Sequence, residues 1–324
     1  MISTALIISY TPIINQISNY GKLNQINNNI FYMSTRLSYT SYYIIGNALN
    51  TQLLYEALHT DVPSGSFTTS LVQIDHYVSP TYTTVHTPSL SILIIMCLLQ
   101  LHLIARLYEC MFIHKYNQYS QQHVFVTIGG CLFYLMLSIT MYCDMVLFTS
   151  NIQSFYVQMN ALLNNTIIPW LLAASLSMYG IAYIEQRRCH LILARLRGNQ
   201  SIHTLSSPQQ NNIQSIHKAS KLLGADTDTI NQLQQQSIHT KYSIPYGNWF
   251  DFISMPHYTA EILIYLSFFM IQLSTRDQFP LLQLLILLWT VVNLCITGYR
   301  SHLWYKNKFI SYPTDRYAVI PYIL

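Results

Sequence analysis

Polar side chains recur at helical spacing within apolar stretches of this 324-residue chain. They are His102, Arg106 and Glu109; Gln186, His190 and Arg197; His257 and Glu261; and His302 and Tyr305. Separations of three, four, seven or eleven residues place each group on one face of a helix. An ionisable side chain in an apolar helix is costly unless it faces a partner or a wet cavity, which makes these groups functional candidates. The alternatives are an interface anchor for a His or Arg stripe, and a helix-dipole contact for Glu261.

These residue types suit an anionic ligand that carries rings. Arg106 and Arg197 can bind phosphates through bidentate hydrogen bonds. Tyr242, Tyr305 and Trp249 offer stacking surfaces, so together the residues fit a dinucleotide. No G-x-G-x-x-G follows a predicted strand and no Walker motif occurs, which excludes the usual nucleotide-binding loops. Residue chemistry alone therefore predicts an anionic, ring-bearing ligand that arrives from the cytosol.

The composition is that of a membrane protein. Hydrophobic residues make up 51% of the chain and charged residues only 9%, against roughly 25% in a soluble domain. Many of the 26 tyrosines lie near the ends of apolar runs, where their rings suit a membrane interface. The net charge of +4 is too small and scattered to indicate nucleic-acid binding. We predict an all-α polytopic membrane protein.

Five apolar runs are close to the length that a bilayer requires, roughly 20 residues. They are 88–107, 124–148, 166–184, 257–273 and 280–299. Residues 1–18 and 38–58 are weaker candidates, so we expect six to seven transmembrane helices. Lys and Arg concentrate in 106–123, in 185–256 and after Arg300, which places these segments and the C-terminus in the cytosol. All the polar stripes then fall at cytoplasmic helix ends, which predicts a polar cavity open to the cytosol.

Residues 198–241 differ from the rest of the chain. They are rich in Gln, Asn and Ser, and Gln-Ser-Ile-His occurs three times, at 200, 214 and 236. We interpret them as a low-complexity cytosolic insertion whose removal leaves activity largely intact. Metal binding by the histidines of the repeat is the alternative. The six cysteines show no metal-ligand spacing, and we predict neither a metal site nor a disulfide framework.

Three segments resemble the steroid 5α-reductase family, and in particular its polyprenol reductase branch. They are IPYGNWFDFISMPHYTAE at 244–261, SHLWYKNKFISYPTDRYAVIPYIL at 301–324 and RLYECMFIHKYNQYS at 106–120. The resemblance covers most of the chain from about Tyr20 and is most specific in the last third. We therefore divide the chain into a weakly matching region (1–87), a reductase bundle (88–197), the insertion (198–241) and a C-terminal cofactor-binding region (242–324).

The resemblance implies NADPH bound within the membrane bundle. Matched position by position, the implied cofactor contacts are Arg106, Gln186, His190, Arg197, Tyr242, His257 and Glu261. His302 and Tyr305 would lie near the nicotinamide, where they are candidates for polarising the substrate oxygen or delivering a proton, with His102 third. For His302, a purely cofactor-orienting role is the alternative.

The substrate implied is a long-chain isoprenoid lipid rather than a steroid. Steroid-reducing members have a Tyr where Leu103 stands and a Glu in an earlier segment that this chain lacks. Hydride added to a double bond needs an acceptor for the incoming charge, and an α,β-unsaturated aldehyde provides one as an enolate. We therefore favour polyprenal over polyprenol, giving dolichal and then dolichol for protein glycosylation at the endoplasmic reticulum. A steroid 5α-reductase, a trans-2-enoyl-CoA reductase and a non-enzymatic receptor or scaffold remain alternatives.

Overall fold

The computed structural model describes residues 32–58, 90–116, 120–148, 167–206, 242–275 and 279–323. Two sequence predictions concern residues outside these ranges: the candidate span at 1–18 and the predicted insertion beyond Ser206. Within the described residues the protein is almost entirely helical. Six long helices follow one another along the chain: α3 (Thr35–Leu58), α5 (Leu90–Tyr108), α6 (Val124–Phe148), α8 (Ile168–Ser206), α11 (Pro256–Thr275) and α12 (Leu281–Lys308).

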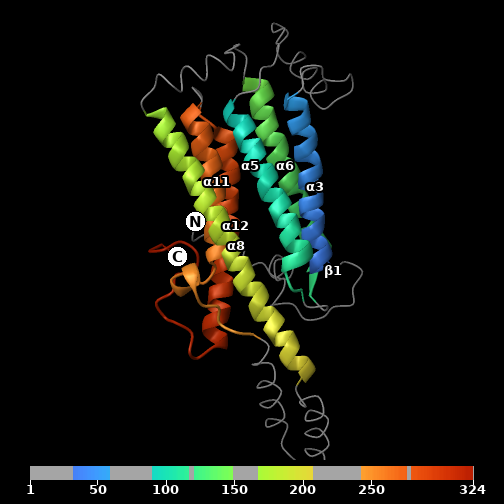
Figure 1. The fold of residues 1–324 in the computed structure, drawn as a ribbon, viewed down its shortest axis with the longest axis vertical. Helices are drawn as coiled ribbons and strands as arrows, with labels where there is room; N and C mark the ends of the chain where they lie inside the picture. Colours follow the sequence, from blue (N-terminus) through green and yellow to red (C-terminus); the bar gives the residue numbers. More distant parts are fainter. Residues whose placement is uncertain are drawn as a thin grey trace, which may run out of the picture.

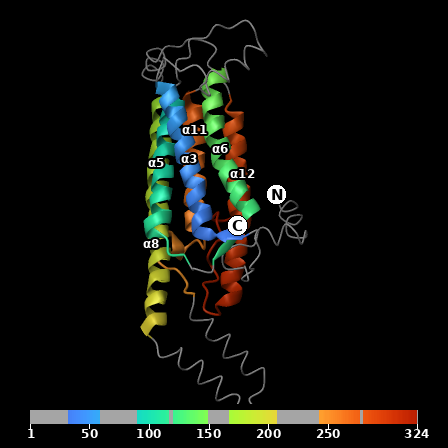
Figure 2. The same ribbon diagram turned by 90° about the vertical axis from the view of Figure 1, so that its right-hand side faces the viewer.

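The helices form one elongated bundle along the long axis of the molecule (Figures 1 and 2). α11 packs against α8 and α12, while α3 packs against α5 and α6. Side chains from both groups share one apolar core, in which Leu99, Leu137 and Phe268 are almost completely buried. Burial of such side chains against one another is what joins the two groups of helices.

Four of the six helices are long and apolar enough to cross a membrane, namely α5, α6, α8 and α12. This finding agrees with the predicted multi-pass membrane protein. α3 and α11 are not among the four, and both bury polar side chains, Asn50 and Glu56 in α3 and Gln272 in α11. The full count of six to seven spans therefore stays a prediction.

Two helices are longer than the apolar runs indicated. The third apolar run predicts a helix that ends at residue 184, but α8 continues without interruption to Ser206. Similarly, α12 extends beyond Tyr299 to Lys308. In both cases the extension is polar but contains no proline, so helix propensity carries the backbone on after the apolar run has ended. Both extensions project beyond α3, α5 and α6 at the same end of the bundle (Figure 1).

The chain after α12 turns back on the segment that precedes α11. Tyr317 N donates to Phe252 O at 2.9 Å, and Ser254 N donates to Tyr317 O at 2.8 Å. A small second core lies beneath this segment, with Val319 completely buried. Gly298 on α12 permits the close approach, because a Cβ there would overlap the Val319 side chain. The two segments that carry the strongest family resemblance thus form one unit.

Candidate active site

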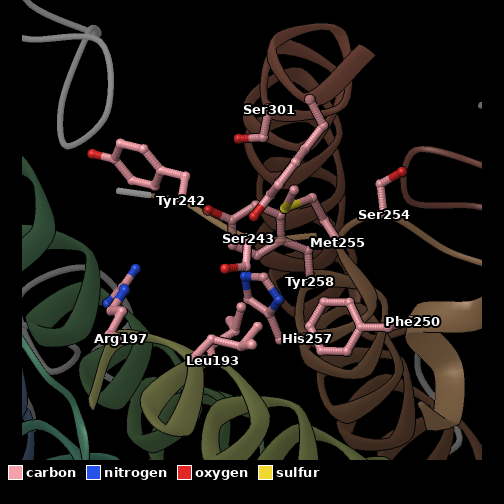
Figure 3. Close-up of a pocket in the computed structure, with 12 residues that line it drawn as sticks. Leu193, Arg197, Tyr242, Ser243, Phe250, Ser254, Met255, His257, Tyr258 and Ser301 are labelled. Carbon is pink, nitrogen blue, oxygen red and sulfur yellow. The ribbon is translucent and has the colours of Figure 1, made fainter. Parts of the chain in front are cut away.

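A pocket lies where the extensions of α8 and α12 meet the segment before α11 (Figure 3). Arg197 comes from α8, Tyr242 from the extended chain before α11, His257 from the start of α11, and Tyr305 from α12. The pocket encloses about 140 Å³ and opens to solvent. It is small, but the convergence of polar groups on it is typical of a small-molecule site.

Arg197 and Tyr242 lie on the same side of the pocket, and the His257 ring lies between them and Phe250 in the view of Figure 3. Arg197 is exposed, and its Nη1 donates to Lys115 O at 3.2 Å. Tyr305 is buried in the pocket wall, stacked on Tyr312 with ring centroids 5.5 Å apart. The pocket therefore combines an accessible guanidinium with aromatic surfaces, which are residue types that suit a phosphate- and ring-bearing ligand.

A second polar cluster lies next to the pocket, between α5, α8 and α11. Arg106 Nη1 is 2.6 Å from Glu109 Oε2 and 2.8 Å from His190 Nδ1. The His190 ring lies 5.7 Å from the His257 ring, centroid to centroid, and so connects the cluster to the pocket. The predicted stripes of three different helices are thus brought together at one end of the bundle.

Glu261 is the centre of the other half of this cluster. Gln186 Nε2 donates to Glu261 Oε2, and His102 Nε2 lies 3.4 Å from Glu261 Oε1. Both ring nitrogens of His102 are buried, with no hydrogen-bond partner among the described residues. A buried ring without such a partner is the kind of group that a bound ligand satisfies.

The end of α5 adds two residues that the sequence analysis did not select. The helix ends in a π-helical turn, Glu109–Ile113, and His114 follows with its ring 5.0 Å from that of His190. Burial, with Arg106 and His190 nearby, lowers the pKa of His114 from 6.5 to about 3. Burial also raises the pKa of Tyr116, whose hydroxyl is 3.3 Å from His114 Nδ1. The environment therefore keeps both side chains neutral at physiological pH.

Glu109, His114 and His190 place one potential ligand atom each within 4.8 Å of one another. Arg106 already contacts Glu109 and His190 from the position that a cation would take. The cluster is therefore better described as a hydrogen-bond network anchored by arginine than as a metal site, since a guanidinium supplies the compensating positive charge.

Not every predicted residue lines the pocket itself. Trp249, expected to stack on the ligand, is absent from its wall, and the ring that packs on Tyr242 is Trp304, 5.1 Å away. His302 does not line the pocket either. It contacts Ser254, which does, and Ser254 Oγ lies 2.6 Å from His302 Nδ1. Ser254 could not be predicted from the sequence beyond its place in the 244–261 segment, because a single serine has no partner residues whose spacing would indicate a role.

The long apolar helices indicate a multi-pass membrane protein, and the polar pocket at one end of their bundle is its candidate ligand site. Comparison with known proteins shows which families the chain is similar to. Residues 215–324 match a family model described as 3-oxo-5-alpha-steroid 4-dehydrogenase. That range includes the pocket residues from Tyr242 onward.

Relatives extend the match beyond this region. The chain is 26% identical to the polyprenal reductase of Homo sapiens over 235 residues, which cover 72% of this chain and 60% of the relative. It is 28% identical to that of Xenopus tropicalis over 239 residues (72% and 61%), and 26% identical to polyprenal reductase 2 of Arabidopsis thaliana over 247 residues (71% and 60%). The chain is thus similar to the 3-oxo-5-alpha-steroid 4-dehydrogenase family in its last third and to polyprenal reductases over most of its length. It spans about 60% of the length of these relatives.

Proposed function

We propose that the protein is an NADPH-dependent oxidoreductase of the endoplasmic reticulum membrane that reduces the α-isoprene double bond of polyprenal. The product is dolichal, which leads to dolichol for dolichol-linked oligosaccharide synthesis and protein N-glycosylation. The observation that carries this proposal is the convergence of three helices' polar stripes beside one pocket, in a chain whose relatives are named polyprenal reductases.

The residues present fit the proposed cofactor. The exposed guanidinium of Arg197 and the rings of Tyr242 and His257 would hold the nucleotide at the pocket. The neighbouring network contributes the remaining proposed contacts, Arg106, Gln186, His190 and Glu261. His102 Nε2 lies 3.4 Å from Glu261 Oε1, while the buried Nδ1 has no hydrogen-bond partner among the described residues, so Nδ1 is consistent with a further hydrogen-bonding ligand at this end of the bundle. When bound, NADPH supplies the hydride for the double bond.

The chain's own residues would supply the complementary charge and proton. A conjugated aldehyde gains negative charge on its oxygen as the β-carbon is reduced, so a donor aimed at that oxygen accelerates the reaction. His302 and Tyr305 are the proposed donors, because both lie on the stretch of α12 that forms the pocket wall. His102 is a third candidate. The proton finally required at the α-carbon can come from one of these groups.

The lipid tail needs no shaped pocket of its own. Side chains such as Leu101, Ile104 and Trp289 are exposed on the outside of the bundle, where lipid would cover them. An isoprenoid chain is similarly stable against such apolar side chains and among lipid tails. We therefore propose that the tail leaves the site sideways, between helices, while the aldehyde meets the cofactor.

The direct test is NADPH oxidation by the purified protein with polyprenal, polyprenol, a 3-oxo-4-ene steroid and a trans-2-enoyl-CoA supplied in turn. We expect turnover with polyprenal and little with the other three. Preferential turnover of the steroid or the thioester would replace the proposal with that alternative. Absence of NADPH binding would remove the proposal altogether.

A further inference from the structure

Ser254 lies between two side chains of the C-terminal region, His302 and Tyr312. Tyr312 Oη donates to Ser254 Oγ at 2.6 Å, and Ser254 Oγ is 2.6 Å from His302 Nδ1. Ser254 is completely buried, and His302 and Tyr312 are each 6% exposed. Water therefore competes little for these hydrogen bonds, which makes them strong and directional.

The direction of the first hydrogen bond determines that of the second. Because the tyrosine hydroxyl donates to Ser254 Oγ, the hydrogen of the Ser254 hydroxyl remains available for His302 Nδ1. A neutral imidazole that accepts a hydrogen bond at Nδ1 carries its proton on Nε2. The His302 ring then has a donor at Nε2, which is the form needed to hydrogen-bond a carbonyl oxygen.

We propose that Ser254 and Tyr312 are positioning residues that hold His302 in its Nε2–H tautomer, as a donor for the oxygen of the aldehyde. This inference rests on the proposed reductase function and adds residues that the chemistry of His302 requires. No proton is passed along the chain of hydrogen bonds. Its effect is to fix the tautomer and the plane of the ring.

Both ends of this arrangement are held rigidly. The backbone of Ser254 and its neighbour is bonded to the C-terminal segment, with Ser254 N 2.8 Å from Tyr317 O and Met255 N 3.1 Å from Ala318 O. The Tyr312 ring stacks on Tyr305 at an interplanar angle of 18°, and the Arg316 guanidinium lies 5.4 Å from its centroid. The C-terminal segment therefore contributes to the site through geometry, although of these residues Ser254, Met255 and Tyr305 line the pocket.

Two variants test the arrangement without removing His302. Ser254→Ala deletes the acceptor and donor between the two rings, while Tyr312→Phe keeps the stacking on Tyr305 and deletes only the hydroxyl. Ser267→Ala is the matched control, because Ser267 is an equally buried serine of α11 that donates only to Ile264 O in its own helix. We expect Ser254→Ala to lower kcat about 10- to 100-fold, and Tyr312→Phe to lower it less, with the KM for NADPH unchanged.

A readout independent of turnover is the ¹⁵N NMR spectrum of histidine-labelled protein in detergent, with the His302 signals assigned by their loss in His302→Gln. We expect one Nε2–H tautomer in the wild type and a mixture in Ser254→Ala. An unchanged tautomer, or wild-type kcat in Ser254→Ala, would overturn the inference. If the wild type does not reduce polyprenal, the proposed function fails, and the spectrum still decides whether Ser254 sets the tautomer.

Discussion

Arg197 and Glu261 differ in the way the protein holds them, and this difference determines what each can do. Arg197 is exposed at the pocket, where its Nη1 donates to Lys115 O. Glu261 is largely enclosed and contacts Gln186 and His102. An exposed guanidinium is available for an incoming phosphate, while an enclosed carboxylate organises its neighbours. Loss of Arg197 should therefore affect ligand binding far more than folding.

Replacement of Arg197 by Ala is expected to raise the KM for NADPH about 10- to 100-fold, the effect of losing a charge-assisted contact to phosphate, with thermal stability nearly unchanged. Arg195→Ala is the control, since Arg195 is an exposed arginine of the same helix that does not line the pocket. Equal effects of the two substitutions would show that only general positive charge matters. The measurement is NADPH titration of initial rates, with thermal unfolding of both variants.

His114 predicts a dependence of stability on pH. Its pKa in the folded protein is about 3, below the ordinary value of 6.5, mainly because of burial. The unfolded chain therefore takes up a proton first, and stability that is present above about pH 6.5 is lost as the pH falls towards 3. Wild-type protein in detergent should lose more thermal stability between about pH 7 and pH 5 than His114→Gln does. His123→Gln, at the other end of the same connection, is the control, and the same pH dependence in wild type and His114→Gln would contradict the assignment.

Among the helices, α8 and α12 show where sequence reasoning succeeds and where it stops. The predicted bounds of the apolar run at 124–148 coincide with those of α6. In α8 and α12, the apolar run ends well before the helix does. Hydropathy indicates which residues suit a bilayer, but it does not indicate where the helical backbone ends. The stripes on α5 and α8 were recognisable by spacing. The contacts between stripes of different helices, such as that of Arg106 with His190, depend on how the helices pack. The spacing of residues within one helix does not predict that packing.

The close contact between α12 and the C-terminal segment predicts a specific sensitivity. A methyl group at Gly298 would overlap Val319, a completely buried and stiff side chain, so Gly298→Ala must displace the segment that holds Ser254. We expect a loss of about 1–3 kcal/mol of stability, with reduced turnover. Gly180→Ala, on α8 with open space around its Cα, should be neutral or slightly stabilising. Thermal unfolding of the two variants in parallel makes the comparison, and equal stability would contradict the contact.

At the scale of the whole molecule, the arrangement separates two kinds of ligand. The polar cluster and the pocket occupy one end of the bundle, while many exposed side chains on the outside of the helices are apolar. A charged nucleotide and a lipid would therefore reach the same place from different phases. Of the residues that the family resemblance implied in the C-terminal third, Tyr242, His257 and Tyr305 line the pocket, while Glu261 and His302 do not. The Ser254–His302–Tyr312 contacts form only when that third folds back on itself.

An isoprenoid tail that lies among lipids predicts weak discrimination by chain length. Polyprenals of different isoprene number, compared at equal mole fraction in the same detergent or bilayer, should give similar kcat/KM values. The physical reason is that added isoprene units exchange one apolar environment for another. A steep dependence on chain length would instead indicate an enclosed tail site within the bundle.

The position of the transferred hydrogen tests the central claim most directly. The purified protein would be supplied with polyprenal and with NADPH that carries deuterium at its transferable position, and the lipid product analysed by mass spectrometry. Conjugate reduction with charge developing on the aldehyde oxygen predicts one deuterium on the β-carbon of the α-isoprene unit, with the aldehyde retained. Deuterium on the carbonyl carbon, or no transfer to the lipid, would contradict the account.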